Sequence, residues 1–175
     1  MEARMNHPAM LIPDAMQILQ SFSALAEKSG LPKPLLELVH LRASQINGCS
    51  LCVEMHARNL TRAGESTERA SERALERAFA VAAWRDAPYF TDAERAALAL
   101  TEAVTRLSER EDPVPDSIWN EAVLYYDEKS LAALLLAISV INVWNRLNVA
   151  TRQVAGEWRK SAEARKWVEE HAGAR

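Results

Sequence analysis

Apolar residues recur along most of the chain every three or four positions, the spacing of an α-helix with one buried face. No stretch shows the sustained alternation of a half-buried strand, and Ala, Leu, Glu and Arg outnumber the β-branched and aromatic residues. The pattern therefore predicts an all-α protein. Its expected helices cover residues 14–28, 32–47, 49–64, 68–84, 91–110, 116–126, 131–149 and 157–171.

Helix breakers and capping residues set the ends of these helices. Gly30 and Gly48 each follow a periodic stretch, where a residue without a side chain ends a helix easily. Thr91 and Glu94 have the spacing of a capping box, in which each side chain bonds the backbone of the other residue. Asp14 is the expected N-cap of the first helix.

The most apolar segment, residues 131–149, carries Leu or Ile on nearly every face and is predicted to be the buried central helix. Its longest apolar run, Leu131 to Ile141, is interrupted by Ser139 and is shorter than the roughly 20 residues that cross a bilayer. The first ten residues contain no apolar stretch of signal-peptide length. We therefore expect a cytoplasmic protein with no membrane contact.

Size and composition predict one folded domain. The chain has 175 residues, of which 49% are hydrophobic and 26% charged, which excludes low-complexity and wholly disordered classes. We expect a single domain over residues 1–175 with its core at about 15–153 and with frayed ends at 1–9 and 172–175. The formal charge of -3 gives no attraction to phosphate, so no nucleic-acid partner is expected.

The candidate chemistry lies at the start of the third expected helix. Cys49, Cys52 and His56 share one face of a helix, because positions i, i+3 and i+7 fall close together around its axis. A helix N-terminus and a neighbouring base both lower the pKa of a thiol, and these influences reach Cys49 and Cys52 respectively. Glu37 lies in an otherwise apolar stretch, where a buried carboxylate needs a partner, and His56 is the expected one.

Other interpretations of these residues stay open at the level of the sequence. The cysteines could be two small buried hydrophobes, since free cysteine is among the most buried residue types. Two thiolates, one imidazole and one carboxylate could also fill a tetrahedral zinc shell. His40 could be a histidine of the core or of a subunit interface.

These residues carry a resemblance to a known family. Glu37 followed by Cys49-x-x-Cys52-x-x-x-His56, with Ser-Gln-Ile-Asn-Gly directly before the first cysteine, resembles the AhpD-like alkylhydroperoxidases of the carboxymuconolactone decarboxylase-like superfamily. The segments 88–99 and 138–146 are also similar to later helices of that family. The resemblance implies an all-helical fold that assembles into trimers or hexamers. It further implies that Cys52 is the cysteine that attacks the peroxide and that Cys49 is the resolving cysteine.

The resemblance also assigns His56 and Glu37 to a proton relay, with one departure from the pattern. Some members of the family carry a histidine between the two cysteines, and that place is Leu51 here. His40, one turn after Glu37 on the same expected helix, could stand in for the missing imidazole.

The expected function is that of a thiol-dependent peroxidase or disulfide reductase. Cys49 and Cys52 would form a reversible disulfide, since i and i+3 at a helix start are neighbours on one face. We expect a peroxide substrate, a thiol reductant (a protein or a small thiol), a homotrimer or homohexamer, and neither a cofactor nor a metal. The alternatives are a carboxymuconolactone decarboxylase and a non-catalytic oligomer that senses redox state or metal.

Overall fold

The computed structural model describes residues 2–63 and 68–157, and its regular elements in that part of the chain are all helices. They are α1 (Pro8–Leu11), α2 (Ala15–Glu27), α3 (Lys33–Ile46), α4 (Ser50–Ala63), α5 (Glu68–Ala80), α6 (Asp92–Thr105), α7 (Asp116–Tyr125) and α8 (Glu128–Thr151), with short 3-10 turns at Val81–Ala83 and Leu107–Glu109. The predicted all-α class is confirmed. The expected helix over 157–171 lies, apart from its first residue, outside the described residues.

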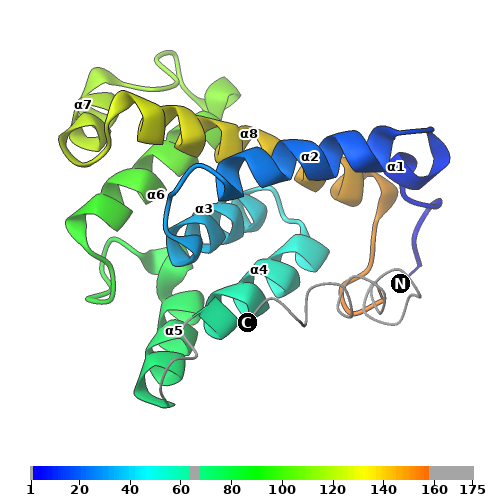
Figure 1. Ribbon diagram of the computed structural model, residues 1–175, viewed down its shortest axis with the longest axis horizontal. Coiled ribbons are helices and arrows are strands. Elements are labelled where there is room, and N and C mark those ends of the chain that lie inside the picture. The colour runs from blue at the N-terminus through cyan, green and yellow to red at the C-terminus, as the bar shows by residue number, and fades with distance from the viewer. Residues whose placement is uncertain (1, 64–67, 158–175) are drawn as a thin grey trace.

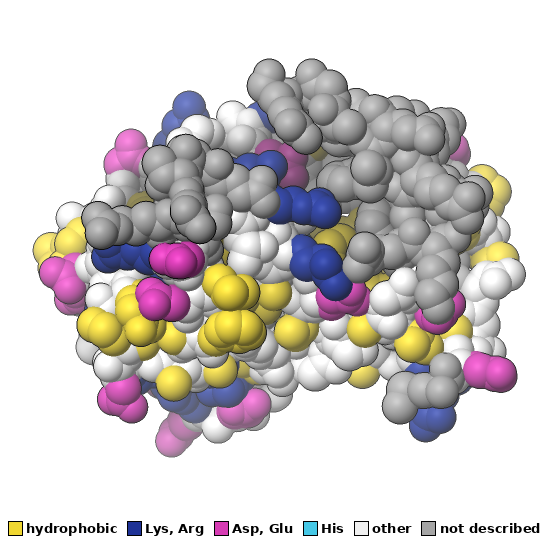
Figure 2. All heavy atoms as spheres, turned by 90° about the horizontal axis from the view of Figure 1, so that it is seen from below, with side chains coloured by type: hydrophobic (Ala, Val, Ile, Leu, Met, Phe, Trp, Pro, Cys, Tyr) yellow, Lys and Arg dark blue, Asp and Glu magenta, His cyan; other side chains and the backbone are white. Residues whose placement is uncertain are grey.

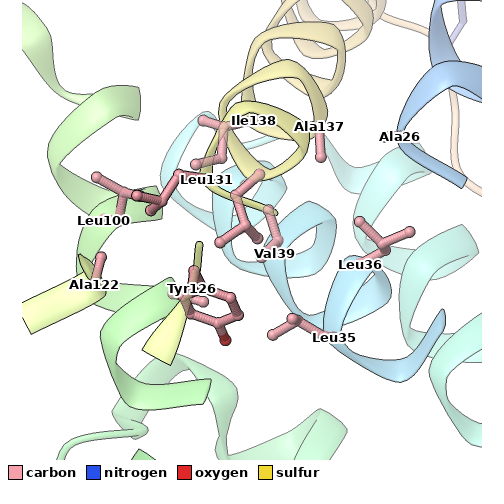
Figure 3. Close-up of a cluster of buried hydrophobic side chains, with 12 residues drawn as sticks. Ala26, Leu35, Leu36, Val39, Leu100, Ala122, Tyr126, Leu131, Ala137 and Ile138 are labelled. Carbon is pink, nitrogen blue, oxygen red and sulfur yellow. The ribbon is translucent and has the colours of Figure 1, made fainter. Parts of the chain in front are cut away.

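Helix α8 is the long central element, as the sequence predicts. Figure 1 shows it running beside α2, and it also packs against α3 and α6. One core cluster joins these helices through Val39 of α3, Leu100 of α6 and Ile138 of α8 (Figure 3). Burial of these apolar side chains is the main force that fixes the helices relative to one another.

Helix α3 is buried on all sides. Every residue from 35 to 41 is buried, because one face of the helix packs in the cluster just described and another contacts a second cluster. The second cluster combines Leu38 and Leu41 of α3 with Leu60 of α4 and Leu98 of α6. Polar residues on α3 are therefore forced into the interior.

The length of α8 differs from the expectation. The helix has 24 residues and a mean hydropathy of 1.5 in its most apolar window, so by length and composition it could cross a membrane. The expectation that no segment reaches that length was wrong, because the helix continues beyond Ser139 and Asn142. Half of that window is buried inside the protein, against α2, α3 and α6 among others.

The N-terminal segment also differs from the expected frayed end. His7 caps α1 by accepting a hydrogen bond from the Ala9 backbone N–H. The Arg4 backbone N–H donates to the Thr151 carbonyl over 2.8 Å, and the Gln153 amide donates to the Met5 carbonyl over 3.1 Å. These contacts hold the segment against the end of α8, so the fraying predicted for residues 1–9 does not describe residues 4–9. Residues 172–175 lie outside the described part.

Most helix ends lie close to their predicted positions. The capping box between Thr91 and Glu94 is present. Asp14 directly precedes α2, but it has a left-handed φ of 65° and makes no capping hydrogen bond with its side chain. The helix predicted to reach residue 84 ends at Ala80 and continues as a 3-10 turn, and the one predicted to reach residue 110 ends at Thr105.

A buried ion cluster around Glu102 joins α3, α6 and the loop after α5. The carboxylate accepts hydrogen bonds from Arg42 Nε at 2.7 Å and Trp84 Nε1 at 2.9 Å, and it pairs with Arg85 at 2.9 Å. Burial raises the pKa of Glu102, but the hydrogen bonds from these three residues outweigh it and hold the pKa below its usual value.

The Glu102→Gln variant is expected to be less stable than the wild type by about 1–3 kcal/mol at neutral pH, the scale of hydrogen bonds to a charged group. Because the pKa is lowered on folding, the carboxylate stabilises the fold above its usual pKa of 4.5 and loses that effect as pH falls through the lowered value. The difference in unfolding free energy between the two proteins should therefore shrink below pH 4.5, as measured by denaturant titration. A constant difference across that range would contradict the assignment.

Candidate active site

A tight turn between α3 and α4 positions the two cysteines. Helix α3 ends at Ile46, and Gly48 takes a φ of +68°, a left-handed conformation that glycine adopts without strain. The Cys49 backbone N–H then donates to the Ser44 carbonyl over 3.0 Å, and the Cys49 carbonyl accepts from the Val53 backbone N–H over 2.9 Å. Cys49 therefore lies directly before the first turn of α4, where the orphan N–H groups of the helix favour negative charge.

Cys49 and Cys52 form a disulfide, with their Cα atoms 5.3 Å apart. The predicted pairing within one chain is confirmed. Both residues are buried, with exposed fractions of 2% and 1%. The Cys52 backbone N–H also donates to the Cys49 sulfur over 3.3 Å, so the first residue of the pair occupies the capping position of the helix.

Glu37 and His56 meet across the helix pair, as the sequence predicts. Their Oε2 and Nδ1 atoms are 2.7 Å apart, and both side chains are about nine-tenths buried. The other carboxylate oxygen, Oε1, accepts a hydrogen bond from Asn59 Nδ2 over 3.3 Å. Arg42, a basic residue on the same helix as Glu37, pairs with Glu102.

The contact with Glu37 fixes the chemistry of the His56 ring. An ionised carboxylate is only an acceptor, so it favours the tautomer of His56 that carries its proton on Nδ1. The opposite nitrogen, Nε2, is then a free base, and it has no hydrogen-bond partner within the described part of the chain. His56 follows Cys52 by one turn on the buried stripe of α4. The arrangement suits an imidazole that exchanges protons with a thiol.

His40 stands next to this pair. Its ring centroid lies 4.8 Å from that of His56, with 58° between the ring planes. Burial lowers the pKa of His40 well below its usual value, and the nearby His56 lowers it further, against a backbone hydrogen bond with Ala137 that raises it. His40 is therefore a neutral ring, and its Nε2 atom has no hydrogen-bond partner among residues 2–63 and 68–157.

Sequence reasoning missed one residue of the site, Asn148. Its side-chain amide donates to the Cys52 sulfur over 3.5 Å from the far end of α8. It is the third in a row of asparagines on that helix, after Asn142 and Asn145, both of which accept a hydrogen bond from Asn47 in the turn before Cys49. Three asparagines at intervals of three in an otherwise apolar helix were the available signal, because buried amides need partners.

An open hollow of about 370 Å³ lies beside the disulfide. Its lining includes Cys49, Ser50, Asn148 and Arg152. Cys52 is not part of that lining, so the first cysteine faces the hollow and the second lies behind it. Glu37, His40 and His56 are likewise absent from the lining, which separates the histidine cluster from this opening.

Fold and site together define a class of protein: an all-helical chain that carries a paired C-x-x-C at a helix start, next to a carboxylate–imidazole pair. The chain belongs to the carboxymuconolactone decarboxylase family, whose sequence model matches residues 13–103, more than half of the chain. The matched region contains Glu37, His40, both cysteines and His56, but not Asn148 of α8.

Two bacterial relatives cover most of the chain. The uncharacterized protein YdfG of Bacillus subtilis (strain 168) is 30% identical over 140 residues, which are 80% of this chain and 88% of that protein. The uncharacterized protein YnjA of Escherichia coli (strain K12) is 29% identical over 142 residues, covering 79% of this chain and 71% of the relative.

Two solved structures share the fold. One is ATU0492 of Agrobacterium tumefaciens, described as a putative antioxidant defence protein AhpD of unknown function. It has 30% identity and a TM-score of 0.74, and the match covers 88% of this chain and 98% of that one. The other is the debrominase Bmp8, with 19% identity, a TM-score of 0.69 and coverage of 90% and 77%. At that identity the second likeness shows the fold alone.

Proposed function

We propose that the protein is a thiol-dependent peroxidase of the AhpD-like type, which reduces hydroperoxides with the Cys49–Cys52 dithiol. The observation that carries the proposal is the disulfide at the start of α4 beside the Glu37–His56 pair. The likeness to the ATU0492 protein, described as a putative antioxidant defence protein, supports it. A carboxymuconolactone decarboxylase would not depend on a thiol pair.

In the proposed reaction the reduced Cys52 attacks the terminal oxygen of the hydroperoxide. His56 takes the thiol proton and passes it to the leaving oxygen, so the O–O bond breaks and gives an alcohol and a Cys52 sulfenic acid. The Cys49 thiol then condenses with this sulfenic acid, which releases water and forms the Cys49–Cys52 disulfide. Glu37 orients the imidazole and stabilises its charged form during the transfer.

An external dithiol, or two molecules of a small thiol, restores the reduced pair and is itself oxidised to a disulfide. Since Cys49 faces the hollow and Cys52 lies behind it, the reductant attacks the Cys49 sulfur. Cys52 then leaves as the thiolate beside His56, ready for the next peroxide. Regeneration of this kind suits the reducing cytoplasm, where thiol systems keep such pairs reduced.

The experiment follows peroxide consumption with hydrogen peroxide and an alkyl hydroperoxide, each supplied with a monothiol, a dithiol or a thioredoxin-type protein. Repeated turnover with at least one reductant is the expected result, and prior alkylation of the reduced protein should abolish it. One equivalent of peroxide consumed per chain, with every reductant, would favour a redox sensor over an enzyme.

We also propose that the chain assembles into a homotrimer or homohexamer. Figure 2 shows apolar side chains gathered on one face of the molecule. Across the described residues, large apolar side chains are exposed on several helices, including Ile18 at 63%, Phe79 at 78% and Leu124 at 73%. Exposed apolar area of this kind is typical of subunit contacts. Light scattering should give three or six chains, and a stable monomer at micromolar concentration would contradict the proposal.

A further inference from the structure

Three buried side chains on α3 and α4 have the composition of a metal site. Glu37, His40 and His56 each offer a donor atom, and these atoms lie within 4.8 Å of one another. One carboxylate and two imidazoles form a common zinc ligand set, with about 2.0–2.2 Å from the ion to each donor. Donors bound at those distances are somewhat over 3 Å apart, so small side-chain rotations would bring the three atoms into place.

A second observation points to a ligand at this cluster. The Nε2 atom of His40 is buried without a hydrogen-bond partner in the described part of the chain. Buried ring nitrogens are normally bonded to protein or water, since leaving one unpaired is costly. Bound between Glu37 and His40, with His56 as a ligand through the Nδ1 atom that faces Glu37, a metal ion would give the His40 Nε2 atom the partner that it lacks.

Neighbouring groups also hydrogen-bond two members of the cluster, as is usual for the ligands of a metal ion. The ring of His40 makes a backbone hydrogen bond with Ala137 of α8. Asn59 donates to the Oε1 atom of Glu37, the carboxylate oxygen that does not face His56, over 3.3 Å. Hydrogen bonds of this kind orient the residues that bind a metal directly, and they tune the affinity of the site for the metal.

From this geometry we propose that Glu37, His40 and His56 bind one divalent transition-metal ion of the zinc type. The site differs from the zinc shell considered from the sequence, because the two thiols are joined in the disulfide and His40 takes part instead. It also revises the expectation that the protein has no metal ligands. If the proposed peroxidase activity holds, the ion would occupy the proton relay and inhibit turnover reversibly.

The test uses the oxidised protein, in which the cysteines are unavailable as ligands and no turnover takes place. Isothermal titration with zinc chloride should show one ion per chain at micromolar concentration. The His40→Gln variant should bind zinc at least about 100-fold more weakly, since loss of even an outer partner of a ligand costs up to that factor. Cobalt(II) should give visible ligand-field bands in the wild type that the variant lacks.

His7→Gln is the matched control. His7 also has a buried Nε2 without a partner in the described residues, but its ring packs against Trp144, near α1. This variant should bind zinc as the wild type does. If circular dichroism shows that His40→Gln is unfolded, Glu37→Gln replaces it under the same criterion.

Three results would overturn the metal site: no saturable binding by the oxidised wild type, equal binding by the folded ligand variant, or binding only after the disulfide is reduced. The last result would assign the ion to the cysteines. Because each is a binding measurement that needs no peroxide turnover, the site stands or falls independently of peroxide reduction.

Discussion

The Cys52→Ser variant is expected to lose peroxide turnover by at least about 10³-fold, because a serine hydroxyl cannot replace the thiolate that attacks the O–O bond. The side chain is almost fully buried and hydrogen-bonded to Asn148, and serine fits the same space. The fold should therefore persist. Initial rates with saturating reductant measure the effect, and circular dichroism checks the fold.

Cys49→Ser is the matched control for the two cysteine roles. This variant keeps the attacking thiol but lacks the resolving one, so it should consume about one equivalent of peroxide per chain and hold a sulfenic acid on Cys52. A dimedone adduct detected by mass spectrometry would locate that acid. If the Cys49→Ser variant reduces peroxide at the wild-type rate, or if no dimedone adduct forms on Cys52, the two roles have been assigned wrongly.

The second large effect is expected at Glu37. The Glu37→Gln variant keeps the shape of the side chain, but it removes the negative charge that orients His56 and stabilises its protonated ring. We expect turnover to fall by about 10²-fold or more, the usual scale of acid–base assistance. The pH profile of kcat/KM should change as well, which a purely structural role of Glu37 would not produce.

Glu102→Gln separates relay chemistry from general destabilisation. Glu102 is also a buried glutamate, but its carboxylate is bonded to Arg42, Trp84 and Arg85 and not to the histidine pair. Its replacement should lower the melting temperature while leaving turnover nearly intact. If Glu37→Gln behaves in the same way, Glu37 has no part in the relay.

The sequence predicted most of the helical architecture because local forces act within a few residues. The capping box at Thr91 and the glycine at position 48 are signals of this kind, and both appear as expected. Failures occurred where neighbours distant in sequence decide the outcome. Helix α1 has only four residues, packs against α2 and follows a segment that is bonded to the end of α8, and no local periodicity could reveal it.

The same distinction between local and distant contacts applies to the candidate site. The sequence by itself determined that Cys49, Cys52 and His56 share one helix face, since that follows from the pitch of α4 alone. It also required a partner for Glu37, because a carboxylate in an apolar stretch cannot stay unpaired.

Only the tertiary structure decided which groups complete the site. Asn148 reaches Cys52 because α8 packs across α4, and the rings of His40 and His56 meet because α3 folds back against α4. These contacts join residues 96 and 16 positions apart in the chain, too far for helical periodicity to relate them. Packing of whole helices sets such distances, since burial of the two apolar clusters fixes how the helices cross.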